Sequence, residues 1–122
     1  MKRDSPPSAR FAILRHDHPW VHWDFLLEAG DVCRTWRLEE EPRAGQPIAS
    51  EAIADHRLHY LSYEGPVSGN RGNVSQWDAG TFWGHIEEET FSVRLAGGRF
   101  RGTCEMTRMN GRAWQAFFLI EG

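Results

Sequence analysis

Hydrophobic and polar residues alternate along most of this chain with the two-residue period of a β-strand, and the 3.6-residue period of a helix is almost absent. Residues 21–28 show the alternation clearly, because Trp23 and Phe25 fall on one face while His22 and Asp24 fall on the other. The same criterion predicts strands at residues 11–16, 21–28, 32–38, 74–78, 81–85, 91–95, 100–106 and 114–120.

The residues between the first two strands predict a tight hairpin. Asp17 can hydrogen-bond its own backbone, and Pro19 fixes φ, so the chain is expected to reverse here. The reversal would fold His16 back beside His22. Two imidazoles from neighbouring strands would then lie at one end of the hairpin.

Turn signals also separate the later strands. The Gly-Gly pair at 97–98 and the Asn-Gly pair at 110–111 predict hairpin turns of the primed type. Residues 78–80 predict a break between two strands, and residues 48–54 fit either a short strand or a turn of helix. We therefore expect a mainly all-β fold, a small antiparallel β-barrel of about eight strands with at most short helical turns.

The composition fits one globular domain. A chain of 122 residues with 40% apolar and 12% aromatic residues can bury a core without disulfides or metals. We expect a flexible N-terminal arm at residues 1–10 and a single domain over residues 11–122. No stretch has the pattern of a signal peptide or a membrane span, so we expect a cytoplasmic protein with no membrane partner. We also expect a monomer. The core should bury Trp23, Phe25, Trp36 and Phe118.

Charge and motif content limit the classes of function. The formal net charge of −3 argues against an extended nucleic-acid track, since such binding depends on many Lys and Arg residues, but it permits a short site for a strand end. The glycine-containing loop at residues 64–73 lacks the Gly-Lys-Ser/Thr ending of a P-loop, which disfavours ATP hydrolysis. Cys33 and Cys104 lie far apart in strand-like segments and are assigned no chemistry.

The first hairpin is the richest source of candidate chemistry. Facing strands would bring His16, His22 and Asp24 together as two imidazoles and one carboxylate, a set that suits a catalytic divalent metal. The alternative is structural: His16 caps a strand, His22 is a partly exposed sheet residue, and Asp24 pairs with Arg15 or Arg34. Periodicity alone does not decide between these interpretations.

The hairpin and several later segments also carry a resemblance to a known family. The sequence resembles the 3′-phosphoesterase domain of bacterial DNA ligase D, and the similarity extends from about residue 11 to about residue 120. The matching segments are His16-Asp17, His22-Trp23-Asp24-Phe25, Arg34-Thr35-Trp36, Asp55-His56 with Tyr60, Tyr63-Glu64-Gly65, Trp77-Asp78 and Gly80-Thr81-Phe82.

The resemblance implies a compact β-barrel and assigns roles to individual residues. It implies that His16, His22 and Asp24 bind one divalent metal, with Mn²⁺ the most consistent ion and Zn²⁺ or Fe²⁺ the alternatives. It also implies that His56 contacts the substrate phosphate and acts with Tyr60 as the catalytic pair. An imidazolium can stabilise charge on a phosphoryl oxygen or protonate a leaving group.

The chain departs from the family pattern at one informative position. The family has a phosphate-binding Arg two residues after the metal-binding Asp, and this chain has Leu26 there. A bidentate Arg–phosphate contact cannot be replaced by an alkyl group. We expect Leu26 to lie beside the metal, and we take Arg71 and Arg15 as the candidate substitute phosphate ligands.

Two classes of function follow. The first is a divalent-metal-dependent phosphoesterase in DNA repair, acting on nucleic-acid 3′ ends or on a small phosphate ester. It would remove a 3′-phosphate or a 3′-ribonucleotide. The second is a non-catalytic or weakly active metal-binding module that contacts end-joining repair proteins and has lost the phosphate clamp. The retained His56 and Tyr60 favour the first, and Leu26 favours the second.

Overall fold

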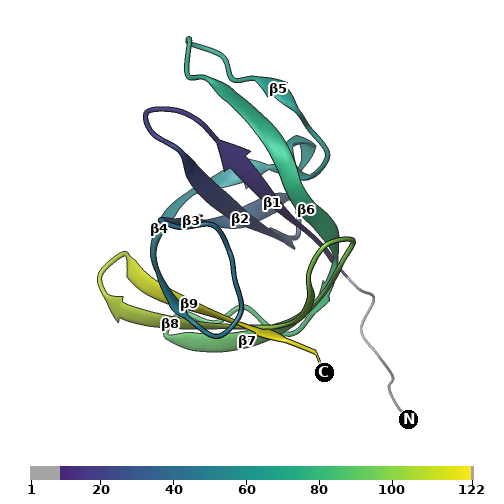
Figure 1. Ribbon diagram of the computed structural model, residues 1–122, viewed down its shortest axis with the longest axis vertical. Helices are drawn as coiled ribbons and strands as arrows, with labels where there is room; N and C mark the ends of the chain where they lie inside the picture. The colour runs from purple at the N-terminus through teal and green to yellow at the C-terminus, as the bar shows by residue number, and fades with distance from the viewer. Residues whose placement is uncertain (1–8, 122) are drawn as a thin grey trace.

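A computed structural model describes residues 9–121, and its regular secondary structure is almost entirely β-strand (Figure 1). β1 begins at Ala9, so two residues of the expected arm belong to the sheet, while residues 1–8 of that arm lie outside the described residues. The elements are β1 Ala9–His16, β2 His22–Ala29, β3 Val32–Leu38, β4 Pro47–Arg57, the 3₁₀ helix η1 Leu58–Leu61, β5 Gly65–Pro66, β6 Asn73–Trp83, β7 Thr90–Gly97, β8 Arg101–Asn110 and β9 Ala113–Ile120.

The strands form a closed antiparallel barrel of 8 strands, which confirms the predicted fold class. Neighbouring strands follow the order β1-β2-β3-β4-β9-β8-β7-β6, and β6 pairs with β1 to close the ring. The short β5 pairs with β6 and lies outside this ring, at the top of Figure 1. Within residues 9–121, no helix is long and apolar enough to span a membrane.

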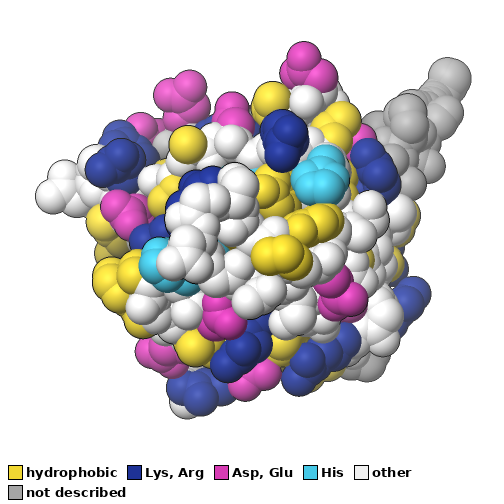
Figure 2. Space-filling model, turned by 90° about the horizontal axis from the view of Figure 1, so that it is seen from above, with side chains coloured by type: hydrophobic (Ala, Val, Ile, Leu, Met, Phe, Trp, Pro, Cys, Tyr) yellow, Lys and Arg dark blue, Asp and Glu magenta, His cyan; other side chains and the backbone are white. Residues whose placement is uncertain are grey.

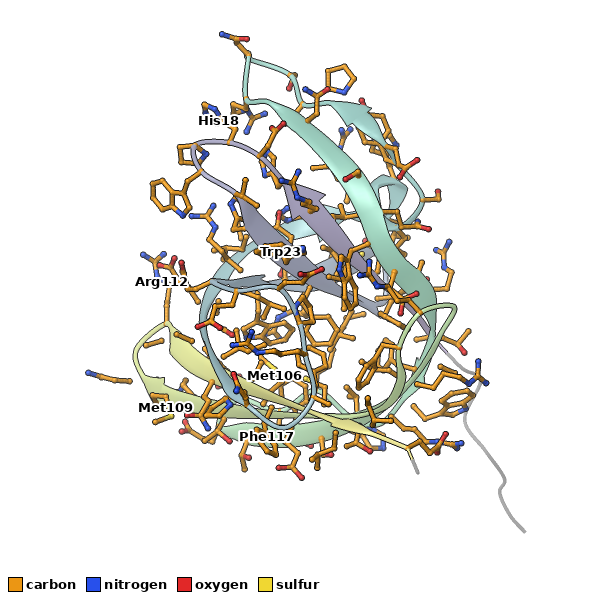
Figure 3. All side chains as sticks on the ribbon, viewed as in Figure 1. His18, Trp23, Met106, Met109, Arg112 and Phe117 are labelled. Carbon is orange, nitrogen blue, oxygen red and sulfur yellow. The ribbon has the colours of Figure 1, made fainter. Side chains whose placement is uncertain are left out.

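Aromatic side chains fill the interior of the barrel. Phe25, Trp36 and Phe118 are buried as predicted, and Phe25 contacts both of the others with ring centroids 6.4 and 5.9 Å apart. Trp23 is only half-buried, because it lies near the open end of β2, where it packs against the edge of the core. Figure 3 shows it between the β1–β2 hairpin and the loop that follows β3.

The expected break at residues 78–80 is absent, because β6 runs continuously through it. The Asp78 carboxylate is buried and accepts backbone N–H bonds from Ala79, Arg99 and Phe100 at 2.9, 2.9 and 2.7 Å. Gly80 is needed for close strand approach, since a Cβ there would lie 2.1 Å from the Ala96 carbonyl oxygen. The glycine therefore marks strand packing and not a turn.

The two predicted primed turns have different outcomes. Gly111 adopts a left-handed φ of 57° in the two-residue connection 111–112 between β8 and β9, so the predicted hairpin forms with its turn one residue later than the Asn-Gly pair. Neither Gly97 nor Gly98 is among the described glycines with positive φ. Gly97 is required for space, because a Cβ there would lie 2.3 Å from Asp78 Oδ2. The Gly-Gly pair thus accommodates a side chain from another strand.

A second, smaller apolar cluster covers the outer face of β1 and β2. Residues 58–67, which contain η1 and β5, fold over this face and contribute Leu61 to the cluster. Ala12 and Leu14 of β1 and Leu26 of β2 point into it, alternating with the neighbours that point into the barrel. The candidate site lies at the margin of this outer layer, so both faces of β1 and β2 are constrained.

Candidate active site

The β1–β2 hairpin places two imidazoles side by side, as the sequence predicted. His16 pairs with His22 across the two strands, and their ring centroids are 4.9 Å apart. The hairpin loop is fixed to β6, because Asp17 Oδ1 accepts the backbone N–H of Asn73 at 2.8 Å. Gly72 allows this approach, since a Cβ there would lie 2.3 Å from the same oxygen.

Asp24 lies two residues beyond His22, on the same face of β2, and its carboxylate is buried. Its Oδ1 lies 3.3 Å from His22 Nε2, and its Oδ2 lies 3.7 Å from His16 Nδ1. One ligand atom from each of the three residues lies within 4.8 Å of the others. The structural alternative is wrong on two points: His22 is fully buried, and Arg34 pairs with Asp55.

His56 approaches the same carboxylate from β4. It pairs with Cys33 of β3, which points into the outer apolar cluster, so His56 is on the outer face as well. Its Nε2 lies 4.0 Å from Asp24 Oδ2. The structure therefore groups His56 with the predicted metal ligands.

Each of the three imidazoles is oriented by a backbone carbonyl. His16 Nε2 bonds the Arg71 oxygen at 2.8 Å, His22 Nδ1 bonds the Trp20 oxygen at 3.0 Å, and His56 Nδ1 bonds the Ala54 oxygen at 3.1 Å. A carbonyl oxygen can only accept, so these nitrogens donate. In the neutral rings the opposite nitrogens, which face Asp24, then carry free lone pairs. Metal-binding histidines have this arrangement.

Two buried polar atoms at the centre have no hydrogen-bond partner among the described residues. They are His22 Nε2 and Asp24 Oδ1, the same two atoms that lie 3.3 Å apart. Buried polar atoms without a partner are costly. A lone pair and a carboxylate oxygen that face one another fit a shared cation, so the donor set is suited to a divalent metal.

The electrostatics of the site favour positive charge beside Asp24. Burial acts to raise the pKa of the Asp24 carboxyl, but interaction with the His16 and His22 imidazoles, whose protonated forms can donate to it, outweighs burial and lowers that pKa to about 2. The hydrogen bond that a protonated His16 can donate to Asp24 raises the pKa of His16, against the opposing effect of burial. Protons on the imidazoles and a metal cation therefore compete for the same position.

A pocket of about 310 Å³ opens beside His16, His56 and Asp24, with the buried His22 behind its wall. Tyr60 lines it and packs against His56 with ring centroids 5.6 Å apart. Leu14 and Val74 contribute to the apolar part of the pocket wall. The volume is at the lower end of the range for small-molecule sites, which suits one phosphate-bearing group.

The two predicted phosphate-binding arginines differ in position. Arg71 lines the pocket, but its guanidinium bonds the carbonyl and hydroxyl oxygens of Ser68 at 2.7 and 3.1 Å. Arg15 is exposed, lies on the opposite face of β1 from His16 and is not in the pocket wall. Adjacent residues of a strand point to opposite faces, so Arg15 does not belong to this site.

Leu26 shares the face of Asp24, as expected, but it does not line the pocket. It is fully buried in the outer apolar cluster together with Leu14 and Leu61. The apolar wall of the pocket comes instead from Leu14, Ile53, Val67 and Val74. The packing of residues 58–67 over this face buries Leu26 away from the pocket. The two-residue period of the strand could not predict that burial.

One pocket residue, Arg37 of β3, was not predicted. It pairs directly with Asp24 across β2 and β3, so the two side chains share a face. The signal was present in the sequence, because a two-residue turn at Gly30-Asp31 fixes the register of the strands on either side. Extending that register along both strands places residue 37 opposite residue 24.

Comparisons with known proteins show which family this chain resembles. A family model described as the DNA ligase D 3′-phosphoesterase domain matches residues 14–108. The multifunctional non-homologous end joining protein LigD of Pseudomonas aeruginosa is 26% identical over 132 residues, covering 98% of this chain and 16% of the relative. The corresponding LigD proteins of Mycobacterium tuberculosis and Mycobacterium bovis are each 32% identical over 116 residues, covering 87% of this chain and 15% of the relative.

Proposed function

Because the chain belongs to the DNA ligase D 3′-phosphoesterase domain family, we propose that it is a divalent-metal-dependent phosphoesterase that acts on nucleic-acid 3′ ends in DNA repair. The reaction would remove a 3′-phosphate or a 3′-terminal ribonucleotide. The chain spans only 15 to 16% of the length of the relatives named above, so this proposal concerns the domain alone.

One observation carries the proposal: three carbonyl-oriented imidazoles converge on one buried carboxylate beside a pocket. His16, His22 and Asp24 would hold the ion, with Mn²⁺ as the first choice and Zn²⁺ or Fe²⁺ as alternatives. A bound ion would polarise the phosphoryl group and supply a water of lowered pKa.

His56 and Tyr60 are the residues we assign to the reacting group itself. Hydrolysis of a 3′-phosphate breaks the bond between phosphorus and the 3′ oxygen, and that oxygen takes up a proton as it leaves. His56 Nδ1 donates to Ala54, which aims Nε2 at the site, where it can deliver that proton or stabilise charge. The ring of Tyr60 packs against His56 at the pocket wall and restricts its orientation.

The surface at this end of the molecule suits a strand end better than a long duplex. In Figure 2, basic and acidic side chains alternate over the face viewed from above, and histidine side chains reach the surface among them. Non-specific duplex binding needs many unopposed cations along a track. A pocket with a few directed groups matches a single terminal phosphate.

The proposal is tested by phosphate release from a primer-template duplex that ends in a 3′-phosphate, with added Mn²⁺. His22→Gln should lower the rate by at least about 100-fold, since it removes a metal ligand. His18→Gln is the matched control, because His18 is exposed at the tip of the same hairpin and is outside the pocket (Figure 3).

Since His22 is fully buried, its replacement is paired with His16→Gln, at a partly exposed position where folding is less affected. Circular dichroism would confirm that each variant is folded. Equal rates for wild type and both ligand variants would reject the assigned metal set. Absence of phosphate release with Mn²⁺, Zn²⁺ and Fe²⁺ would reject the hydrolase.

The second candidate is a metal-binding module of end-joining repair with little or no catalysis. The observation that favours it is the apolar Leu26, buried where the family has a phosphate-binding arginine. Such a module would bind Mn²⁺ and lose that binding in His22→Gln, yet release no phosphate. The same set of measurements therefore separates the two functions.

A further inference from the structure

The pocket contains an arginine whose position suits a phosphate ligand better than that of either predicted arginine. We propose that Arg37 of β3 binds the phosphoryl group of the substrate and supplies the cationic contact that position 26 lacks. This inference rests on the proposed function, since it names the residue that recognises the substrate of that site.

The first argument is placement. Arg37 lies directly opposite Asp24 in the β2–β3 register, on the outer face that carries the histidines, and it lines the same pocket. Directly opposed residues have Cβ atoms about 5 Å apart, so the arginine stem starts beside the candidate ion site. A phosphoryl group that approaches Asp24 and the histidines would therefore meet this side chain.

The second argument is the missing partner. Arg37 lies between two strand neighbours with carboxylates, Asp24 on β2 and Glu51 on β4. Among residues 9–121 it forms an ion pair with neither, because Asp24 contacts the histidines and Glu51 pairs with Arg112. Its Nε is buried without a hydrogen-bond partner in the described structure. A buried guanidinium nitrogen without an acceptor is costly, and an anion in the pocket would satisfy it.

The third argument is a comparison with the other arginines of the pocket wall. Arg71 already bonds two oxygens of Ser68, and the guanidinium of Arg57 lies over the Tyr60 ring at 5.8 Å from its centroid. Both residues are exposed, whereas Arg37 is partly buried. Charge-assisted hydrogen bonds are strongest where water is excluded and the donor is held in place. Arg37 therefore has the best position for a bidentate contact.

The variants Arg37→Ala and Arg37→Lys test this assignment. Arg37→Ala should lower kcat/KM for the 3′-phosphate primer-template by about 10- to 100-fold, the effect of losing a hydrogen bond to a charged group. Arg37→Lys should recover part of the loss, because it keeps the charge and lacks the planar fork. Arg112→Ala is the matched control, since this arginine lies at the β8–β9 hairpin outside the pocket (Figure 3).

Binding measurements separate this inference from the proposed function. Wild type should bind inorganic phosphate, and should bind an oligonucleotide with a 3′-phosphate more tightly than the same strand with a 3′-hydroxyl. In Arg37→Ala both the phosphate affinity and this preference should fall, while Mn²⁺ affinity, measured by electron paramagnetic resonance, should stay unchanged. A merely structural role for Arg37 would not change the preference selectively.

Each result has a defined meaning. If wild type releases no phosphate but shows an Arg37-dependent preference for the 3′-phosphate, the hydrolase fails and the assignment of Arg37 stands. If folded Arg37→Ala keeps the wild-type preference, or if wild type has no affinity for phosphate, the assignment is wrong. Phosphate release by wild type with unchanged kinetics in Arg37→Ala would leave the hydrolase in place and reject the role of Arg37.

Discussion

At the scale of single residues, the orientation of each site histidine is determined by the hydrogen bond that its ring nitrogen away from Asp24 makes. Each site histidine donates one N–H to a main-chain oxygen, which orients the other nitrogen toward Asp24. Leu26 shows the converse, because an apolar side chain on the same face packs into the outer cluster and leaves the pocket. Burial likewise determines the reactivity of the two cysteines.

The first residue-scale prediction concerns those cysteines. Burial is the main cause that raises the pKa of the Cys33 thiol to about 11, and burial also raises the pKa of Cys104. Since the thiolate is the reactive form, neither should react with a thiol reagent at pH 8 in the native protein. Both should react at once in about 6 M guanidinium chloride, where the core is exposed. Rapid labelling of the native protein would contradict the burial of these side chains.

The second residue-scale prediction concerns Leu26→Arg. A guanidinium at this fully buried position must either displace the outer cluster or remain unpaired within it. We expect a loss of about 3 kcal/mol or more in the free energy of unfolding, measured with urea. Leu26→Met, the volume-conserving control, should cost less than about 1.5 kcal/mol. A fully stable Leu26→Arg variant with raised turnover would show that position 26 can still supply the phosphate clamp.

At the scale of elements, the hairpins depend on contacts made by neighbouring strands as much as on their own turn residues. Asp78 on β6 accepts three N–H bonds, two of them from residues 99 and 100 in the β7–β8 connection. Gly97 leaves room for that carboxylate. The connection between β7 and β8 is therefore built around a side chain from β6.

The element-scale prediction is that Asp78→Ala destabilises the barrel by roughly 3 kcal/mol or more. The substitution leaves three backbone donors without their acceptor, and each buried unsatisfied group costs about 1–3 kcal/mol. Asp31→Ala is the control, because Asp31 is exposed in the β2–β3 turn and should change stability by less than about 0.5 kcal/mol. Equal midpoints in urea for the two variants would show that water replaces the lost acceptor.

At the scale of the whole molecule, the fold and the site are largely independent. The barrel is closed by β1–β6 pairing and filled by an apolar core. Of the candidate metal ligands, only His16 takes part in that pairing, at the last position of the register, and none belongs to the core. The site occupies the outer face of β1 to β4, at the margin of the layer formed by residues 58–67. A folded barrel can therefore hold the site open before any ligand binds.

The whole-molecule prediction is that protein treated with EDTA stays folded and that Mn²⁺ then raises its Tm. Binding at 100 times Kd adds about 2.7 kcal/mol by mass action, which corresponds to a shift of roughly 10 °C for a domain of this size. His18→Gln should show the full shift, and His22→Gln should show almost none. Unfolding on metal removal would mean that the ion holds the β1–β2 hairpin in place.

Local sequence signals determined the strand content and the β1–β2 hairpin. Alternation with period two is a property of consecutive residues, and the turn at Asp17 and Pro19 reverses the chain over a few positions. Together they were sufficient to place His16 beside His22 and Asp24 on the same face. The grouping of these three residues was therefore predictable from the sequence by itself, and their role as metal ligands stays a proposal.

Only the tertiary structure decided which side chains complete the pocket. The position of His56 depends on the register of β3 and β4, and the burial of Leu26 depends on residues 58–67, which lie roughly 30 positions further along the chain. Likewise, Gly80 and Gly97 resemble turn residues in sequence, yet they provide space for atoms of other strands. The physical reason is that alternation and turn propensity act between near neighbours, whereas packing and space are set by segments that meet after the barrel closes.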